Sequence, residues 1–352
     1  MILVHSHGQV GAHSSWLQAL MSAGARGVQL FYIASALTLC LSWEFRASRE
    51  RHPIRNFYLR RAFRIIPMFY VAIAGYLLLY GLTPRYFAPN GVPWYYIPLT
   101  GLFLNGFHPE MITSVVPGGW SIVVEMTFYA IFPILVMRFR SVAALTMLLA
   151  VSLIARFAWV RLVYRIFLPS YAPEQSHLVD ALAELGFLSQ FPVFVMGMLT
   201  FWCFRNADRS KSVVAAAAVL LVAWLIALTV VINTPPAAIL SMHVVMGAIL
   251  ALFALTLARY PVRLLVNPLF IWIGKLSFSM YLSHFAVIEA FRASGISARF
   301  PSGDSSAFLH YLLVVAATAG VSSICYRVIE RPSIEAGRRL IDRLESAHGV
   351  AA

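Results

Sequence analysis

Charged residues are scarce in this sequence of 352 residues. Only 12% of the residues are charged and 60% are hydrophobic, whereas about a quarter of the residues in a typical soluble domain are charged. This shortage excludes an ordinary soluble domain and indicates a protein that crosses a membrane several times. Acidic residues are scarcer than basic ones. The sequence has 14 Asp and Glu and 27 Lys and Arg, which gives a formal net charge of +13. In a membrane protein such an excess is tested against loop topology before nucleic-acid binding is considered.

Several chemical motifs are also missing. The three cysteines, Cys40, Cys203 and Cys325, lie in or at the ends of apolar runs without C-x-x-C spacing. We therefore expect packing residues that form neither disulfides nor a metal site. The sequence contains no G-x-S-x-G elbow and no P-loop. It also contains no internal repeat and no long linker, which favours one domain.

Apolar runs long enough to cross a membrane recur along the chain. A spanning helix needs about 20 mostly apolar residues. Residues 95–107 are too short and are interrupted by Pro98, Gly101 and Gly106, so we expect a re-entrant segment that does not cross. The runs that qualify are 27–43, 62–81, 119–137, 142–160, 180–203, 212–232, 237–258, 267–290 and 306–327.

The basic residues predict the topology. If the short segment does not cross, alternate loops share one face and hold 20 of the 27 Lys and Arg residues. By the positive-inside rule this face, which includes the C-terminus, is cytoplasmic. The net charge is therefore mainly a topology signal, and no nucleic-acid partner is expected. The loops are 44–64, 138–140, 205–211, 259–275 and 327–343.

The same alternation of loops between the two membrane faces places residue 26 outside, so a further helix has to precede it. The residues before it begin with MILVHSHG, and eight residues rise about 12 Å against a hydrocarbon core of about 30 Å. We therefore expect a first helix that is truncated. The sequence predicts an all-α polytopic membrane bundle of about 10 spanning helices and one short re-entrant segment. We expect a membrane domain at 1–335 and a short cytoplasmic tail at 336–352.

Ionisable residues at membrane depth are costly and usually face the interior of a bundle, so each is a functional candidate. In GGWSIVVEMTFYAIFP, Ser121 and Glu125 are four residues apart on one helix face, which predicts an inward-facing Glu125. A proton acceptor or cation anchor is one interpretation, and a structural ion pair is the other. In GKLSFSMYLSHF, Ser277, Tyr281 and His284 share a face. For His284 the alternative to a functional role is a structural hydrogen bond.

Three histidines, His5, His7 and His13, cluster near a membrane boundary at the N-terminus. A neutral His can take a proton from a hydroxyl near pH 7 without the cost of a buried charge, which suggests a general base. A metal site is the alternative, but no Asp, Glu or Cys stands beside them at ligand spacing. We therefore predict no metal site.

The stretch FYLRRAFRIIPMFY at 57–70 places three arginines at the start of a membrane helix. Arg60 and Arg64 are four residues apart, and Arg61 and Arg64 are three apart, so all three can project to one side. Guanidinium groups bind phosphate through paired hydrogen bonds, so this register fits an anionic substrate. Contact with lipid headgroups is the competing interpretation.

Five stretches in order along the chain resemble the acyltransferase-3 family of integral membrane acyltransferases. They are GVQLFYIASALTL, FYLRRAFRIIPMFY, GGWSIVVEMTFYAIFP, IGKLSFSMYLSHF and YRVIERP. One match alone would be a weak signal, whereas five in order in a membrane context predict membership. The matching residues are Gly27, Leu30, Phe31, Ser35, Arg61, Arg64, Ile65, Pro67, Trp120, Ser121, Glu125, Phe128, Tyr129, Gly274, Ser277, Tyr281, Leu282, His284, Glu330 and Pro332.

Two departures accompany the resemblance. The family carries an arginine upstream of a histidine in its first helix. His5 fits that histidine, but the arginine would precede Met1. The family's Asp in the next segment is Gln29 here.

The resemblance implies transfer of an acyl group, usually acetyl, from cytoplasmic acyl-CoA to a hydroxyl of a sugar or glycan. A surface polysaccharide or lipopolysaccharide at the cell (inner) membrane would be such an acceptor, and the partners would be acyl-CoA, the glycan or glycolipid, and membrane lipids. Acyl-CoA would act as donor substrate, with no bound cofactor. His5 would act as general base or acyl carrier, and Glu125 would orient a cationic or imidazole group. Arg60, Arg61 and Arg64 would bind the CoA phosphates, with support from Ser35, Trp120, Ser121, Tyr281 and His284.

A transporter or flippase of a glycan or acyl precursor is the alternative. Intramembrane Glu and His beside a short broken segment suit it equally. The enzyme is favoured because the sequence contains the R-x-x-R-I-x-P and W-S-x-x-x-E blocks and no inverted repeat. No His is followed five residues later by Asp, so the pattern of many soluble CoA acyltransferases is absent.

Overall fold

The computed structural model describes residues 1–206 and 241–346. Within these ranges the regular structure is helical, apart from one isolated antiparallel bridge between Arg85 and Ala88. Eight of the described helices are long and apolar enough to cross a membrane, which confirms an all-α polytopic bundle. Eight of the nine predicted runs overlap them, and the remaining run, 212–232, lies outside the described residues. The eight are Ser15–Ala47, Pro53–Tyr80, Gly119–Arg138, Val142–Ser170, Pro173–Arg205, Met242–Arg259, Pro268–Ala293 and Asp304–Ser346.

The N-terminal segment contains one very short helix. α1 (Ile2–His7) has six residues and rises about 9 Å, too little to cross a bilayer. α2 (Ser15–Ala23) leads through a 3-10 turn into α3 (Gly27–Ala47), and α4 (Pro53–Tyr80) follows.

The stretch 95–107 contains only short helical pieces. α5 (Tyr96–Gly101) has six residues and is followed by a 3-10 turn at Asn105–Phe107. Neither piece is long enough to cross, in agreement with the predicted re-entrant segment.

The remaining helices complete the bundle. The predicted domain boundary after residue 335 falls inside α14, and this division stays a prediction. The helices are α6 (Gly119–Arg138), α7 (Val142–Phe167), α8 (Ser176–Leu185), α9 (Phe187–Asn206), α11 (Met242–Arg259), α12 (Pro268–Ala293), α13 (Asp304–Cys325) and α14 (Arg331–Ser346), with a π-turn at Tyr326–Glu330 between the last two.

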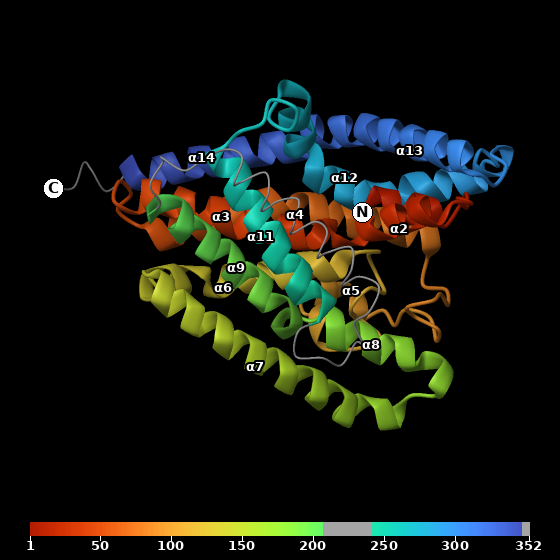
Figure 1. Ribbon diagram of the computed structural model, residues 1–352, viewed down its shortest axis with the longest axis horizontal. Helices are drawn as coiled ribbons and strands as arrows, with labels where there is room; N and C mark the ends of the chain where they lie inside the picture. Colours follow the sequence, from red (N-terminus) through yellow and green to blue (C-terminus); the bar gives the residue numbers. More distant parts are fainter. Residues whose placement is uncertain (207–240, 347–352) are drawn as a thin grey trace.

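α3 lies at the centre of the bundle. It packs against α9 and α11 on one side and contacts α4 and α6 on another, while α12 pairs with α13. Figure 1 shows α13 and α14 in a row along one edge and α7 along the opposite edge. Close packing of α3 on α9 depends on small residues, because a Cβ at Gly197 would stand 2.7 Å from Cβ of Ala36.

Large apolar side chains remain exposed on the outer helix faces. Leu78 is 89% exposed, Ile154 69% and Ile324 65%. Such exposure would be costly in water, whereas lipid tails solvate these side chains at no cost. The protein is therefore a multi-pass membrane protein.

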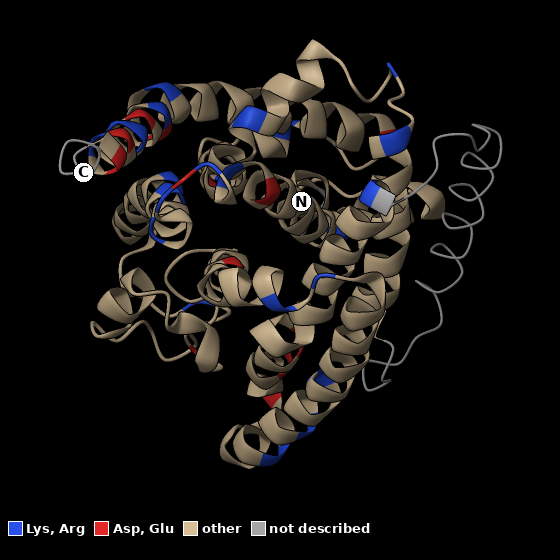
Figure 2. Ribbon diagram, turned by 90° about the vertical axis from the view of Figure 1, so that its left-hand side faces the viewer, with Lys and Arg blue, Asp and Glu red and all other residues tan. Residues whose placement is uncertain are grey.

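One end of the bundle is rich in charge. The α3–α4 connection, the α6–α7 connection and the end of α14 lie together at the left of Figure 1. Viewed from this end in Figure 2, basic and acidic segments alternate along α14, which ends beside the C label, while most of the bundle is uncharged. The basic stretches 44–64 and 138–140 thus reach the same end, which we call the basic end.

Candidate active site

The first of three connected cavities lies at the basic end, between the start of α4 and α14. It has a volume of about 370 Å³, and we call it the basic chamber. The three arginines predicted to act together, Arg60, Arg61 and Arg64, all line it because they share one side of α4. The other charged residues in its wall are Arg46, Arg49, Arg338, Glu50, Asp342 and Glu345.

The three α4 arginines have different surroundings. Arg60 forms a two-pronged ion pair with Glu50, with Nη1 2.7 Å from Oε1 and Nη2 3.1 Å from Oε2. Arg61 and Arg64 form no ion pair with any residue in the described ranges. The charge of Arg60 is therefore offset internally, and Arg61 and Arg64 are the pair available to an anion.

The same two arginines also line the second cavity, a middle chamber of about 450 Å³. Arg61 and Arg64 thus stand where the basic and middle chambers meet. The rest of the wall comes from α3, α4, α6 and α12, and consists of Phe31, Ala34, Ser35, Thr38, Ile65, Glu125, Tyr129, Gly274, Ser277 and Phe278.

Glu125 is the acidic residue of the middle chamber. It is 1% exposed, which confirms the inward orientation predicted from its helix face. Its Oε1 accepts hydrogen bonds from Ser35 Oγ, at 2.8 Å, and from the hydroxyl of Tyr129. Its Oε2 is buried and has no hydrogen-bond partner among the described residues. The carboxylate is held by two hydroxyls and keeps one oxygen free beside the arginines. Its role toward a cationic or imidazole group stays a prediction.

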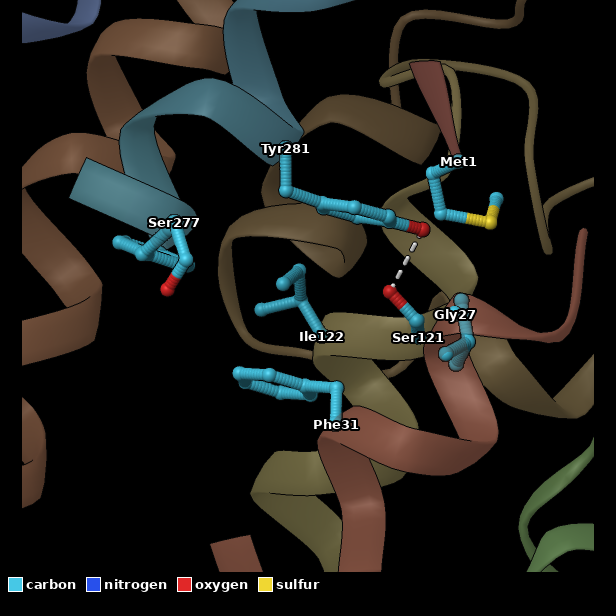
Figure 3. A pocket seen from close by; sticks show the side chains of 9 residues that line it. Met1, Gly27, Phe31, Ser121, Ile122, Ser277 and Tyr281 are labelled. Carbon is cyan, nitrogen blue, oxygen red and sulfur yellow. Dashed lines mark hydrogen bonds between the residues drawn. The ribbon is translucent and has the colours of Figure 1, made fainter. Parts of the chain in front are cut away.

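The third cavity, which we call the far chamber, has a volume of about 190 Å³. It shares Phe31, Ser277 and Phe278 with the middle chamber. Figure 3 shows the side chains of Tyr281 and Ser121 pointing toward one another in its wall. The remaining lining residues are Met1, Gly27, Val28 and Ile122.

Tyr281 is fixed by the N-terminus of α6. Its hydroxyl donates to the carbonyl of Gly118 at 2.9 Å and accepts from Ser121 Oγ at 2.8 Å. Gly118 has φ +74°, and a Cβ there would stand 2.9 Å from the Tyr281 hydroxyl. Only glycine suits both the left-handed backbone and this close approach. The Gly-Gly-Trp-Ser turn thus places a tyrosine hydroxyl from α12 beside the far chamber.

His284 and His5 lie beside Tyr281. The His284 ring centroid is 5.8 Å from that of Tyr281 and 5.4 Å from that of His5. Nδ1 of His284 donates to the carbonyl of Tyr281 at 2.6 Å, because a carbonyl can only accept. In the neutral ring Nε2 of His284 therefore carries a lone pair. Nε2 of His284 and Nε2 of His5 are both buried without a hydrogen-bond partner in the described ranges. Two residues 279 positions apart thus form a histidine pair.

The three chambers form one row through the bundle. Arg61 and Arg64 belong to the first two, and Phe31, Ser277 and Phe278 belong to the last two. Along α3 the middle and far chambers extend from Thr38 to Gly27, a rise of about 17 Å. A flexible arm held by the arginines can therefore extend along this row toward the histidine pair.

Comparison with known proteins decides the family. The family model described as an acyltransferase domain matches residues 1–327. The chain belongs to the acyltransferase-3 family. Membership of a family described by an acyltransferase domain favours the enzyme over the transporter alternative.

Two curated relatives match most of this chain. The O-acetyltransferase OatA of Staphylococcus aureus (strain NCTC 8325 / PS 47) is 23% identical over 355 residues, covering 91% of this chain and 53% of the relative. The acyltransferase MdmB of Streptomyces mycarofaciens is 25% identical over 343 residues, covering 91% and 84%. The chain therefore spans about half the length of the first relative. No solved structure matches this chain significantly.

Three predicted site residues, His5, His284 and Trp120, line none of the three chambers. Trp120 is buried at the start of α6. The backbone N–H of His13 donates to Asp304 at 2.8 Å, beside the start of α13. Of His5 and His13, only His5 lies beside His284.

The sequence alone did not predict several of the contacts at this site. Tyr129 is a matching family residue, and its spacing of four from Glu125 is the signal for their hydrogen bond. Glu50 and Arg338 come from a loop and from the C-terminal helix, and no local pattern points to either. Glu330, at the end of the π-turn, is buried and accepts from Ser279 Oγ on α12.

Proposed function

We propose that the protein transfers an acetyl group from acyl-CoA to a hydroxyl of a sugar or glycan acceptor. The observation that supports this most directly is the row of three chambers. It extends from two arginines without ion pairs, Arg61 and Arg64, to Tyr281, which lies beside the pair formed by His5 and His284. Phosphate recognition at one end and proton transfer at the other are the two requirements of a CoA-dependent acyl transfer.

The donor phosphates bind in the basic chamber in this proposal. Guanidinium groups bind phosphate through two parallel hydrogen bonds, and Arg61 and Arg64 have no competing carboxylate within ion-pair distance among the described residues. The apolar arm of the donor then follows the middle chamber past Phe31 and Phe278. The thioester reaches the far chamber, next to Tyr281.

The histidine pair carries the proton. Nε2 of His5 accepts the proton of the acceptor hydroxyl while its oxygen attacks the thioester carbon. The new C–O bond forms, the C–S bond breaks, and the proton passes to the departing thiolate. Nδ1 of His284 donates to the Tyr281 carbonyl, and its Nε2 has no hydrogen-bond partner among the described residues. Its ring lies beside that of His5, which it supports in this proposal.

Glu125 lies in the wall of the middle chamber, along the proposed path of the donor. Its charge lies near Arg61 and Arg64 across the middle chamber, where it limits the excess of positive charge once the donor has left. Its hydrogen bonds to Ser35 and Tyr129 keep the channel wall in place. We therefore assign Glu125 a positioning role.

The basic end is the cytoplasmic side in this proposal. The positive-inside distribution of the loops supports it, and acyl-CoA is available there. The acetyl group follows from the O-acetyltransferase relative, and the glycan acceptor follows from the family resemblance.

The test is an acetyl-transfer assay on membranes that contain the protein. Labelled acetyl-CoA and a panel of sugar and glycan acceptors should yield a base-labile labelled ester. His5→Ala should abolish the product without changing membrane insertion. The matched control is His13→Ala, because the backbone of His13 bonds to Asp304 at the start of α13, whereas the ring of His5 lies beside that of His284. Absence of label with every acceptor, or full activity of His5→Ala, would contradict the proposal.

A further inference from the structure

Part of the basic chamber has no role in the donor site as proposed so far. Arg61 and Arg64 are half-buried and also line the middle chamber. Arg49 and Arg338 line the basic chamber, are absent from the middle chamber, and are exposed. The chamber therefore has two pairs of arginines, one deep and one at the surface.

The ion pairs in the wall leave both pairs of arginines available to bind a ligand. Glu50 is engaged by Arg60 and Arg46, at 2.7 and 3.5 Å. Glu345 is engaged by Arg55, at 3.1 Å. Four of the six arginines in the wall then have no ion pair within the described ranges, namely Arg49, Arg61, Arg64 and Arg338. Asp342 is the one acidic residue of this wall without an ion pair in the described ranges, so four unpaired cations stand against one carboxylate. This excess of positive charge around one cavity favours a ligand with several negative charges.

α14 holds Arg338 in a defined place. Ser333 Oγ donates to the carbonyl of Phe63 at 2.6 Å, and Gly337 packs directly on the Phe63 side chain. At the far end of α14, Glu345 accepts from Asn56 at 2.9 Å. The helix is thus attached to α4 on both sides of Arg338, and the guanidinium is part of the chamber wall and not of a loose tail.

Coenzyme A carries phosphate in two separate places, a pyrophosphate next to the pantetheine arm and a monoester on the ribose 3′-oxygen. The arm has to enter the middle chamber, so the pyrophosphate belongs beside Arg61 and Arg64. We propose that Arg338, with Arg49, binds the ribose 3′-phosphate and makes the enzyme selective for coenzyme A over donors that lack this group. This inference rests on the proposed acyl-CoA donor.

A phosphate at this position could also belong to an anionic lipid headgroup, because the chamber opens at the charged end of the bundle. The shared chemistry is a phosphate between two exposed guanidinium groups. If the site held an anionic lipid, KM would be the same for donors with and without the 3′-phosphate. A comparison of donors that differ only in the 3′-phosphate therefore separates the two sources.

The experiment measures KM for acetyl-CoA and for acetyl-3′-dephospho-CoA in the wild type, in Arg338→Gln and in Arg339→Gln. Arg339 is the matched control, because it is exposed on the same helix and does not line the chamber. The wild type should show a KM about 10-fold lower for acetyl-CoA than for the dephospho donor, the size expected for one charge-assisted hydrogen bond. Arg338→Gln should raise KM for acetyl-CoA toward that of the dephospho donor, because Arg49 alone then faces the 3′-phosphate, whereas Arg339→Gln should keep the 10-fold preference.

The ratio of the two KM values is taken within each protein, so a partial loss of folded protein in a variant cancels. Equal KM values for both donors in the wild type would overturn the inference, as would an Arg338→Gln variant that keeps the wild-type preference. If the proposed function itself is wrong, neither donor will give transfer. The increase in unfolding temperature of the wild type with coenzyme A is then compared with the increase with 3′-dephospho-coenzyme A. Equal stabilisation would overturn the 3′-phosphate site independently of transfer, and stronger stabilisation by coenzyme A, lost in Arg338→Gln, would support it.

Discussion

Gly337→Ala tests whether α14 is a required wall of the basic chamber. A Cβ at residue 337 would stand 2.8 Å from both Cβ and Cγ of Phe63. These atoms are at the root of the Phe63 side chain, so rotation of the ring cannot relieve the contact. Carbon atoms prefer about 3.5 to 4.0 Å, so α14 and α4 must separate by about 1 Å.

The cost of this separation can be estimated. Overpacking at a tight contact costs about 1 to 3 kcal/mol, and the fixed position of the Phe63 atoms favours the upper part of that range. Alanine recovers about 1 kcal/mol of helix propensity relative to glycine. The net loss is about 1 to 2 kcal/mol of α14 docking, equivalent to about a 5- to 30-fold change in the docking equilibrium. The KM for acetyl-CoA should rise by up to this factor.

The assay is acetyl transfer at varied acetyl-CoA, with thermal unfolding of the purified protein measured in parallel. The matched control is Gly320→Ala on α13, where a Cβ meets no atom within 4 Å and the same gain in helix propensity applies without a clash. The double variant Phe63→Ala/Gly337→Ala removes the clashing ring and should recover part of the lost affinity. A Gly337→Ala variant with the KM and unfolding temperature of Gly320→Ala would refute the reasoning.

Three further predictions concern the chambers. His5→Ala should lower kcat by about 100- to 10,000-fold, the usual contribution of a general base; a smaller effect in a single-turnover assay would move the base to His284. Glu125→Gln keeps the shape but weakens two hydrogen bonds by about 1 kcal/mol or more each, so transfer should fall about 30- to 100-fold; an unchanged rate would show that the charge is dispensable. Arg64→Lys should raise the KM for acetyl-CoA about 10-fold because one of two phosphate hydrogen bonds is lost; an unchanged KM would return Arg64 to a topological role.

Hydropathy accounts for the success of the fold prediction. A membrane helix satisfies its own backbone hydrogen bonds and needs only an apolar surface of sufficient length, so composition is enough to locate it. The eight described helices that can cross a membrane overlap the predicted runs for this reason. The local period of the helix also predicted that Glu125 faces inward and that Arg60, Arg61 and Arg64 share one side.

Partnerships between distant residues could not be predicted in this way. The spacing rules treated Arg60, Arg61 and Arg64 alike, yet Glu50 from the preceding connection pairs with Arg60 alone. The amphipathic C-terminal segment suggested a tail, whereas close packing of Gly337 on Phe63 brings Arg338 into the chamber wall. Both outcomes depend on which helix faces meet.

The sequence by itself determined that this protein is an all-α membrane bundle and that it belongs to a family of acyltransferases, because both follow from apolar length and from short blocks of matching residues. Only the tertiary structure decided that His5 and His284 form a pair, and that a row of three cavities extends from Arg61 and Arg64 to Tyr281, beside that pair. The physical reason is that helical periodicity fixes which side chains share one face of one helix. The packing of α1, α3, α4, α6 and α12 against one another fixes which of those faces meet.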